Sequence, residues 1–172
     1  MSKITQKLEL LTNVAILIVS IAIAGVLVRK FVFPPPPPRA ELPGIKEPTI
    51  GNRVNLAGLD WSQSHKNVLL VLQKGCHFCT DSAPFYRNLI KQTEGKDVKV
   101  IAVLPQSDEE AKSYLRDLNI TGIEVKQSSL NSLEVGGTPT IVVADDKGRI
   151  TDVWFGRLQP DKENEVLAKL TG

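Results

Sequence analysis

The stretch Val68-Leu-Leu-Val-Leu-Gln-Lys-Gly-Cys-His-Phe-Cys79 decides the fold of this chain. It joins a continuous apolar run, Val68 to Leu72, to a C-x-x-C motif formed by Cys76 and Cys79, the two cysteines of the chain. A short apolar run of this kind predicts a buried strand that leads the motif into the first turn of a helix. There a thiol meets unpaired backbone N–H groups and the positive end of the helix dipole, and both favour the thiolate that attacks disulfides.

A C-x-x-C motif can also be half of a zinc site. Structural zinc takes four ligands, usually completed by a second Cys pair or a Cys/His pair at close spacing. The histidines of the chain are His65 and His77, so the pattern favours redox chemistry, and no metal site is expected. With no other cysteine in the chain, any disulfide is the reactive one between Cys76 and Cys79, and no further cofactor is expected.

The composition bounds the class of protein. The chain has 172 residues and is 42% hydrophobic, which suits one domain of ordinary size with appendages. Its 21 basic and 19 acidic residues give a net charge of +2, with no long run of one sign. A nucleic-acid-binding surface needs a concentrated excess of Lys and Arg, so this class of function is set aside.

The N-terminal part of the chain predicts a membrane anchor. From Leu10 to Val28 there is no charged residue, and Arg29 and Lys30 follow directly. At about 1.5 Å per residue this stretch is long enough to cross a hydrocarbon core of roughly 30 Å. We therefore expect a short tail over residues 1–9 and a transmembrane helix over residues 10–30.

A cleaved signal peptide is the alternative to an anchor. Lys3 and Lys7 form a basic start, and Ala22-Ile23-Ala24 is a small-x-small sequence of the kind that signal peptidase cuts. Cleavage there would leave an apolar new terminus around Val26–Val28, so the anchor is preferred. The flanking basic residues are neutral or adverse for placing the N-terminus in the cytosol, and they do not settle the orientation.

A proline-rich linker separates this segment from the folded domain. Pro34 to Pro38 are five consecutive prolines, which hold an extended polyproline helix and act as a spacer. The chain stays polar, with further Pro and Gly residues, up to Thr49. We therefore assign residues 31–49 to the linker and residues 50–172 to one domain.

Strand and helix patterns alternate within this domain, and such alternation favours a mainly parallel sheet covered by helices. Asp145-Asp146-Lys147-Gly148 separates two late strands and predicts an antiparallel hairpin. The expected strands are Val68–Leu72, Val98–Leu104, Ile123–Lys126, Thr140–Ala144 and Arg149–Phe155. The expected helices are Cys79–Thr93, Asp108–Leu118 after a Ser107/Glu110 capping box, and Pro160–Leu170, with a helical turn near Ser129–Val135.

This order of elements resembles thioredoxin over residues 50–172. The resemblance rests on the C-x-x-C motif, on Pro84 five residues after Cys79, and on Gly137-Thr-Pro-Thr140 ahead of the hairpin. The extra helix and strand before this last motif look like the insertion of membrane-anchored, exported redoxins of the TlpA and cytochrome c maturation type. The resemblance implies an α/β thioredoxin fold, with a central mixed sheet flanked by helices and one preceding transmembrane helix.

The resemblance also implies roles for individual residues. Cys76 would attack a substrate disulfide, and Cys79 would resolve the mixed disulfide. Thr138 and Pro139 match the cis-proline loop, which presents backbone groups to an extended substrate chain. The implied partners are protein thiols or disulfides, together with a separate redox partner, because the predicted membrane segment holds no cysteine to relay electrons.

Departures from the family leave the direction of electron flow open. Leu70 stands where thioredoxins carry a buried aspartate, and Ser82 stands where many exported reductants of this type carry a glutamate. Asp81 is the remaining candidate for a proton acceptor near the motif, although a carboxylate in a first helical turn is commonly a solvated partner of the helix dipole.

The residues around Cys76 point toward an oxidising pair. A protonated His77 and the nearby Lys74 would favour the thiolate and lower the pKa of Cys76, and this stabilises the reduced form. Phe78 replaces the proline that is frequent before the second cysteine. We therefore assign His77, Phe78 and Lys74 to tuning of the cysteine pair, and this tuning opposes the usual reducing role of exported redoxins.

The predicted function is membrane-tethered thiol-disulfide exchange. A tethered dithiol is most useful where disulfides persist, which favours a single-pass protein of a bacterial plasma membrane with its C-terminal domain outside the cytosol. One alternative is a non-catalytic module that binds extended peptides beside Thr138 and Pro139. A thiol peroxidase is a second alternative, which is disfavoured because no cysteine lies in a Pro-x-x-x-Thr-x-x-Cys setting.

Overall fold

The computed structural model describes residues 13, 16–21, 23 and 48–172. The described residues of the first unit, up to Ile23, are helical. The predicted anchor and linker lie largely outside the described residues. Among the helices that the structure does describe, none combines the length and the apolar character that a membrane crossing requires. The second unit, described from Pro48 onward, contains the sheet and the cysteine pair.

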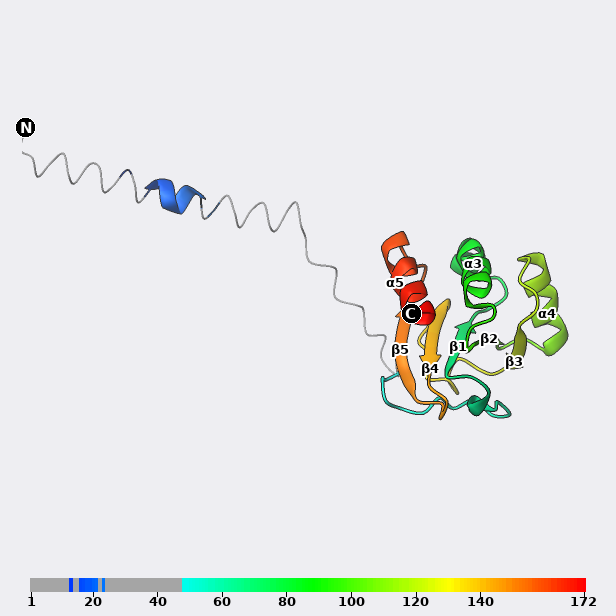
Figure 1. Ribbon diagram of the computed structural model, residues 1–172. Coiled ribbons are helices and arrows are strands. Elements are labelled where there is room, and N and C mark those ends of the chain that lie inside the picture. Colours follow the sequence, from blue (N-terminus) through cyan, green and yellow to red (C-terminus); the bar gives the residue numbers. More distant parts are fainter. Residues whose placement is uncertain (1–12, 14–15, 22, 24–47) are drawn as a thin grey trace, which may run out of the picture. The chain divides into compact units, whose positions relative to one another are not determined.

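A five-stranded mixed sheet forms the centre of this unit, in the order β3-β2-β1-β4-β5 (Figure 1). The pairs β1–β2 and β2–β3 are parallel, and the pairs β1–β4 and β4–β5 are antiparallel. The mixed sheet expected from the thioredoxin resemblance is confirmed. The strands are β1 (Lys66–Val71), β2 (Val98–Leu104), β3 (Glu124–Gln127), β4 (Thr140–Ala144) and β5 (Ile150–Phe155).

The helical elements differ from the expected pattern at two points, the division of one predicted helix and the 3-10 helix at Trp61–Gln63, which was not predicted. The predicted helix Cys79–Thr93 starts earlier, at His77, and is divided at Ser82 into two helices. The division follows from Pro84, which has no N–H to donate to the carbonyl four residues before it. The helical elements are η1 (Trp61–Gln63), α2 (His77–Asp81), α3 (Ala83–Thr93), α4 (Asp108–Asp117) and α5 (Pro160–Thr171).

The two faces of the sheet are covered differently. The helices α3, α4 and α5 pack on one face (Figure 1). The other face is covered by the segment that contains η1 and by the turns between β3 and β4, so the described helices flank one face rather than both. The helix-side cluster includes Val68, Leu70, Leu72, Cys79, Tyr86, Leu89, Ile141 and Val166. The opposite cluster includes Val54, Leu56, Trp61, Leu69, Val71, Leu133 and Val135.

These two clusters explain the apolar run that precedes the C-x-x-C motif. Successive side chains of a strand point to opposite faces, so Leu70 faces the helices while Leu69 and Val71 face the other cluster. Both faces of this run are buried away from water, and a strand that is buried on both faces needs an unbroken apolar sequence. Strand β1 therefore forms a rigid central support that ends next to the cysteines.

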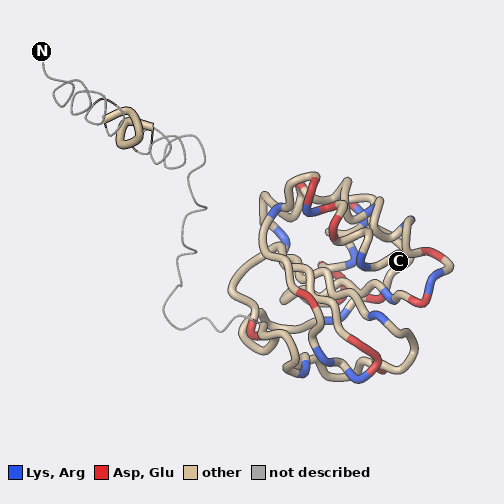
Figure 2. Tube along the Cα trace, turned by 60° about the vertical axis from the view of Figure 1, so that its left-hand side comes forward, with Lys and Arg blue, Asp and Glu red and all other residues tan. Residues whose placement is uncertain are grey.

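Charged residues are interspersed over the folded unit. Figure 2 shows Lys and Arg interspersed with Asp and Glu over the folded unit, and the acidic run Asp108–Glu110 at the start of α4 is short. Several of these charges pair locally, as Lys112 does with Asp108 in α4.

Trp61 and the turn between β4 and β5 lie against each other, and this contact predicts a large stability effect. Gly148 has a φ of +74°, and a Cβ added there would lie 2.9 Å from Cε2 of Trp61. We expect Gly148→Ala to reduce the free energy of unfolding by about 2–4 kcal/mol, because left-handed strain and overpacking add. The control is Gly95→Ala, at a φ of +73° with nothing within 4 Å of the new Cβ.

The control is expected to cost about 1 kcal/mol, from backbone strain alone. Urea unfolding of the two variants measures the difference between them. Equal losses would show that the indole ring of Trp61 moves aside freely and that the contact with Gly148 does not restrain the turn.

Candidate active site

Cys76 caps the N-terminus of α2, directly after the loop that leaves β1. Its backbone N–H donates to the carbonyl of Gln73 at 3.1 Å. Its sulfur accepts a hydrogen bond from the backbone N–H of Cys79 at 3.2 Å, in the place where Ser or Asp usually caps a helix. The predicted location of the C-x-x-C motif at a helix start is confirmed.

The two cysteines form a disulfide, and they differ in exposure. Cys76 and Cys79 are bonded to each other, with Cα atoms 5.3 Å apart. Cys79 is fully buried among the apolar side chains of the helix-side cluster, whereas Cys76 is half-buried at its edge. A large substrate can therefore reach the sulfur of Cys76 more readily than that of Cys79.

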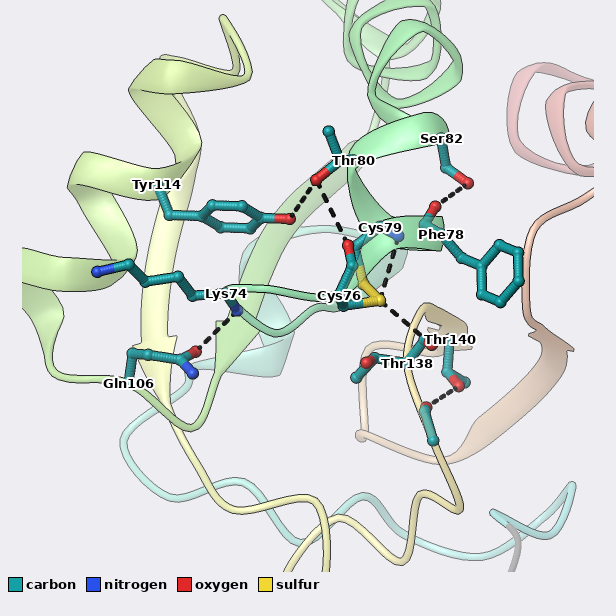
Figure 3. The surroundings of a disulfide bond; sticks show 11 residues. Lys74, Cys76, Phe78, Cys79, Thr80, Ser82, Gln106, Tyr114, Thr138 and Thr140 are labelled. Carbon is teal, nitrogen blue, oxygen red and sulfur yellow. Dashed lines mark hydrogen bonds between the residues drawn. A yellow bond between two sulfur atoms is a disulfide. The ribbon is translucent and has the colours of Figure 1, made fainter.

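The loop before β4 lies against the disulfide (Figure 3). The Thr138–Pro139 peptide bond is cis, as predicted. The carbonyl oxygen of Thr138 lies 3.5 Å from the sulfur of Cys76. When Cys76 is a thiol, this oxygen can accept its S–H, whereas the N–H of Cys79 favours the thiolate.

Two hydrogen bonds hold this loop in place. The backbone N–H of Gly156, just after β5, donates to the carbonyl of Pro139 at 2.7 Å. The hydroxyl of Thr140 donates to the carbonyl of Gly137, also at 2.7 Å. Thr138 is thus held next to the sulfur of Cys76 by contacts from β4 and from the end of β5.

Both predicted cations have carboxylate partners in the structure, and their role in tuning Cys76 stays a prediction. The ammonium of Lys74 points away from Cys76 in Figure 3 and lies 3.4 Å from a carboxylate oxygen of Glu110. The Nε2 atom of His77 lies 3.3 Å from Oδ2 of Asp81, one turn further along α2.

Asp81 has a second partner that the sequence did not reveal. The guanidinium of Arg157 lies 3.1 Å from the same Oδ2 atom that faces His77. Residues 81 and 157 are far apart in the sequence, and no local motif marks their contact. Gly156, which holds the Pro139 carbonyl, was missed for the same reason.

Phe78 is the exposed member of the motif. Its side chain is 55% exposed, whereas the other large hydrophobic side chain exposed in the described part from Pro48 onward is Ile50. Its carbonyl accepts the hydroxyl of Ser82 at 2.8 Å, at the division between α2 and α3. Ser82 therefore supports the backbone of the motif. It occupies the position of the glutamate of related reductants but offers no carboxylate in its place.

The surroundings of Cys79 are apolar. Leu70 is fully buried in the same cluster. Tyr86, also in this cluster, is 1% exposed, and its burial raises the pKa of the phenol, which stays neutral. Over the residues that the structure describes, no three His, Cys, Asp or Glu side chains gather closely enough to hold a metal ion.

Comparisons with known proteins agree with this geometry. The redoxin family model matches residues 38–170. No curated protein matches the chain. Among solved structures, the chain is similar to a thiol-disulfide isomerase from Corynebacterium glutamicum, with 23% identity, 74% of this chain and 96% of that chain covered, and a TM-score of 0.55.

Two further solved structures show the same fold. One is the thioredoxin domain of a thiol-disulfide oxidoreductase from Bacteroides vulgatus, with 15% identity, coverage of 73% of this chain and 98% of that chain, and a TM-score of 0.55. The other is a thiol:disulfide interchange protein from Bacteroides sp., with 16% identity, coverage of 74% and 92%, and a TM-score of 0.55.

The family match spans both parts of the site, the C-x-x-C motif after β1 and the loop before β4. A half-exposed cysteine bonded to a buried one can exchange its disulfide with an external thiol. The chain therefore belongs to the redoxin family and is a thioredoxin-like thiol-disulfide oxidoreductase.

Proposed function

We propose that the protein is tethered to the membrane by its N-terminal segment and exchanges disulfides with other proteins outside the cytosol. The observation that carries the exchange reaction is the asymmetry of the pair, with Cys76 half-exposed beside the Thr138 carbonyl and Cys79 buried behind it. Cys76 is the sulfur that meets the substrate, and Cys79 is the sulfur that releases it.

Reduction of a substrate would proceed in two displacements. The Cys76 thiolate attacks one sulfur of the substrate disulfide, the substrate S–S bond breaks, and the other substrate sulfur leaves and takes up a proton. The Cys79 thiol then loses its proton and attacks the sulfur of Cys76, which releases the second substrate thiol. The protein ends as the disulfide, and a separate redox partner must return two electrons.

Oxidation of a substrate uses the same sulfurs in reverse. A substrate thiolate attacks Cys76 in the disulfide, Cys79 leaves as thiolate, and a second substrate thiol displaces Cys76 from the mixed disulfide. The N–H of Cys79 at 3.2 Å from the Cys76 sulfur stabilises its thiolate in both directions.

Extended contacts with the substrate would form at the exposed edge of the site. Pro139 itself is buried, while the half-buried Thr138 and the exposed Phe78 lie on either side of Cys76. A substrate chain that passes Cys76 would meet an aromatic ring on one side and a fixed loop on the other. This arrangement suits protein substrates better than small thiols.

The tether is supported by the sequence before the folded unit. The uncharged run from Leu10 to Val28 is long enough for a membrane anchor, and the sequence of five prolines after it favours an extended spacer. Disulfide exchange is useful where disulfides persist, so the folded unit would lie on the outer side of a bacterial plasma membrane.

Fusion of alkaline phosphatase behind Gly172 tests the location of the folded unit. The enzyme is active only after export, because its own disulfides need an oxidising compartment. We expect an active, membrane-bound fusion from the full chain. The control lacks residues 1–30 and should give a soluble, inactive fusion. A full-length fusion that is stable but inactive would place the cysteine pair in the cytosol.

A further inference from the structure

We propose that Asp81 and Arg157 are positioning residues that set the redox potential of the Cys76–Cys79 pair by holding the His77 imidazole away from the sulfur of Cys76. The inference rests on the proposed exchange reaction and adds to it a control on how strongly the pair oxidises. Two features of the structure support it, namely the pairing of the imidazole and the anchoring of Arg157.

The imidazole of His77 pairs with the carboxylate of the last residue of α2, at the other end of this helix from Cys76. Cys76 caps the N-terminal end of this helix, whereas Asp81 is its last residue. The Nε2 atom of His77 lies 3.3 Å from Oδ2 of Asp81, and the His77 side chain is otherwise exposed. An imidazolium in this place is neutralised by the carboxylate, so it gives the Cys76 thiolate little stabilisation.

Arg157 holds the carboxylate in that place from a second element. Its Nη1 atom lies 3.1 Å from the same oxygen of Asp81, whose side chain is 27% exposed. The residue before it, Gly156, is fixed because its N–H donates to Pro139 at 2.7 Å. The loop after β5 thus contacts both α2 and the loop beside the sulfur, and Arg157 starts from a fixed backbone.

This anchoring fixes the geometry of the ion pair rather than adding to the stability of the fold. Exposed pairs usually add little to stability, partly because two long side chains lose freedom when they meet. Here the short Asp81 side chain is mostly covered and the Arg157 backbone is fixed. We expect little effect of this pair on unfolding and a measurable effect on the charge near the sulfur.

The charge near the Cys76 sulfur matters because it stabilises only the reduced form of the cysteine pair in its equilibrium with glutathione. Two glutathione molecules reduce the protein disulfide, which gives oxidised glutathione and the Cys76 and Cys79 thiols. The Cys76 thiol then loses its proton to solvent in the fraction that its surroundings allow. A positive charge near that thiolate stabilises the reduced form and makes the pair a stronger oxidant.

The test measures the equilibrium constant with glutathione for the full-length protein in detergent micelles. Asp81→Asn removes the carboxylate and frees the imidazole, so we expect the equilibrium to move toward the reduced protein by about three- to tenfold. Arg157→Gln loosens the carboxylate that holds the imidazole, so we expect a smaller shift in the same direction, toward the reduced protein, by about two- to threefold.

A double-mutant cycle tests whether His77 carries the effect. In a His77→Gln background the effect of Asp81→Asn should fall to less than half of its value in the wild-type background. An undiminished shift in that background would show that the carboxylate acts directly on the sulfur, and it would overturn the positioning role. No shift from Asp81→Asn in either background would overturn the inference entirely.

The matched control is Lys112→Gln. It removes an exposed ion pair of the same i,i+4 kind, with Asp108 in α4, and it should leave the equilibrium constant unchanged. An equal shift in the control would show that any change of surface charge moves the equilibrium, which would also overturn the inference. Exchange with protein substrates is tested separately by trapping with a Cys79 variant, so failure of the one is distinguishable from failure of the other.

Discussion

Replacement of Cys79 by alanine is expected to abolish turnover and to leave the protein covalently attached to its substrates. Cys76 still attacks from its half-exposed position, but no second sulfur lies behind it to break the mixed disulfide. Turnover should fall by at least about a hundredfold, because both cysteines act as one unit. A peptide-binding module would instead keep its function in this variant.

Trapped complexes can be seen directly. Membranes from cells that carry the Cys79→Ala protein are alkylated and separated without reductant, and we expect bands of high mass that disappear with dithiothreitol. The matched control is Cys76→Ala, which should give neither turnover nor complexes, because the remaining Cys79 is fully buried. Complexes formed by that control, or wild-type turnover by Cys79→Ala, would contradict the assignment of attacking and resolving sulfurs.

Much of the fold could be predicted because its signals are local. The run Val68–Leu72 is apolar at every position, which is what a strand buried on both faces requires. The predicted strand Val98–Leu104 has the same bounds in the structure. The capping box before α4 is also confirmed, since the N–H of Glu110 donates to the hydroxyl of Ser107 at 3.4 Å. Each of these signals lies within one element.

The C-x-x-C motif and the cis-proline loop could be found together for a different reason. Neither the spacing of Cys76 and Cys79 nor the Thr138–Pro139 pair reveals a contact between residues so far apart. The resemblance to thioredoxin supplied the contact, and the structure confirms it with the 3.5 Å separation between the Cys76 sulfur and the Thr138 carbonyl. A family pattern carries long-range information that periodicity lacks.

The environment of the sulfur could not be predicted from the residues beside it. Proximity in sequence placed His77 and Lys74 next to Cys76, but it did not show that His77 pairs with Asp81 and Lys74 with Glu110. Side-chain direction depends on partners from other elements, and Arg157 comes from the loop after β5. The electrostatics of the site therefore required the tertiary structure.

Leu70→Asp is expected to destabilise the protein strongly. Leu70 is completely buried on the helix-side face of β1, in the cluster that surrounds Cys79. The substitution removes a packed side chain and buries a carboxyl group. Thioredoxins carry a buried aspartate at the corresponding position. We expect the free energy of unfolding at pH 8 to fall by about 4–6 kcal/mol, from lost packing and from desolvation of the charge.

Leu70→Asn is the matched control, since it has nearly the same shape and polarity without a titratable group. Urea unfolding of both full-length variants in micelles, at pH 5, 6.5 and 8, separates the cost of the polar group from the cost of the charge. The pH-dependent part of the difference between the variants should be about 1.5 kcal/mol at pH 5 and reach about 3 kcal/mol at pH 8. A difference that does not depend on pH would contradict burial of position 70.

The sign of this pH dependence follows from the direction of the pKa shift. Burial disfavours the carboxylate, so the introduced carboxyl has a higher pKa in the folded protein than its unfolded value of about 3.9. Below that value both states are protonated, and the charge costs nothing. As the pH rises from the unfolded pKa to the higher folded pKa, the unfolded state binds fewer protons than the folded state, so stability falls over this range and levels off above the folded pKa. We therefore expect the apolar cluster around Cys79 and position 70 to disfavour an ionised buried acid at this position.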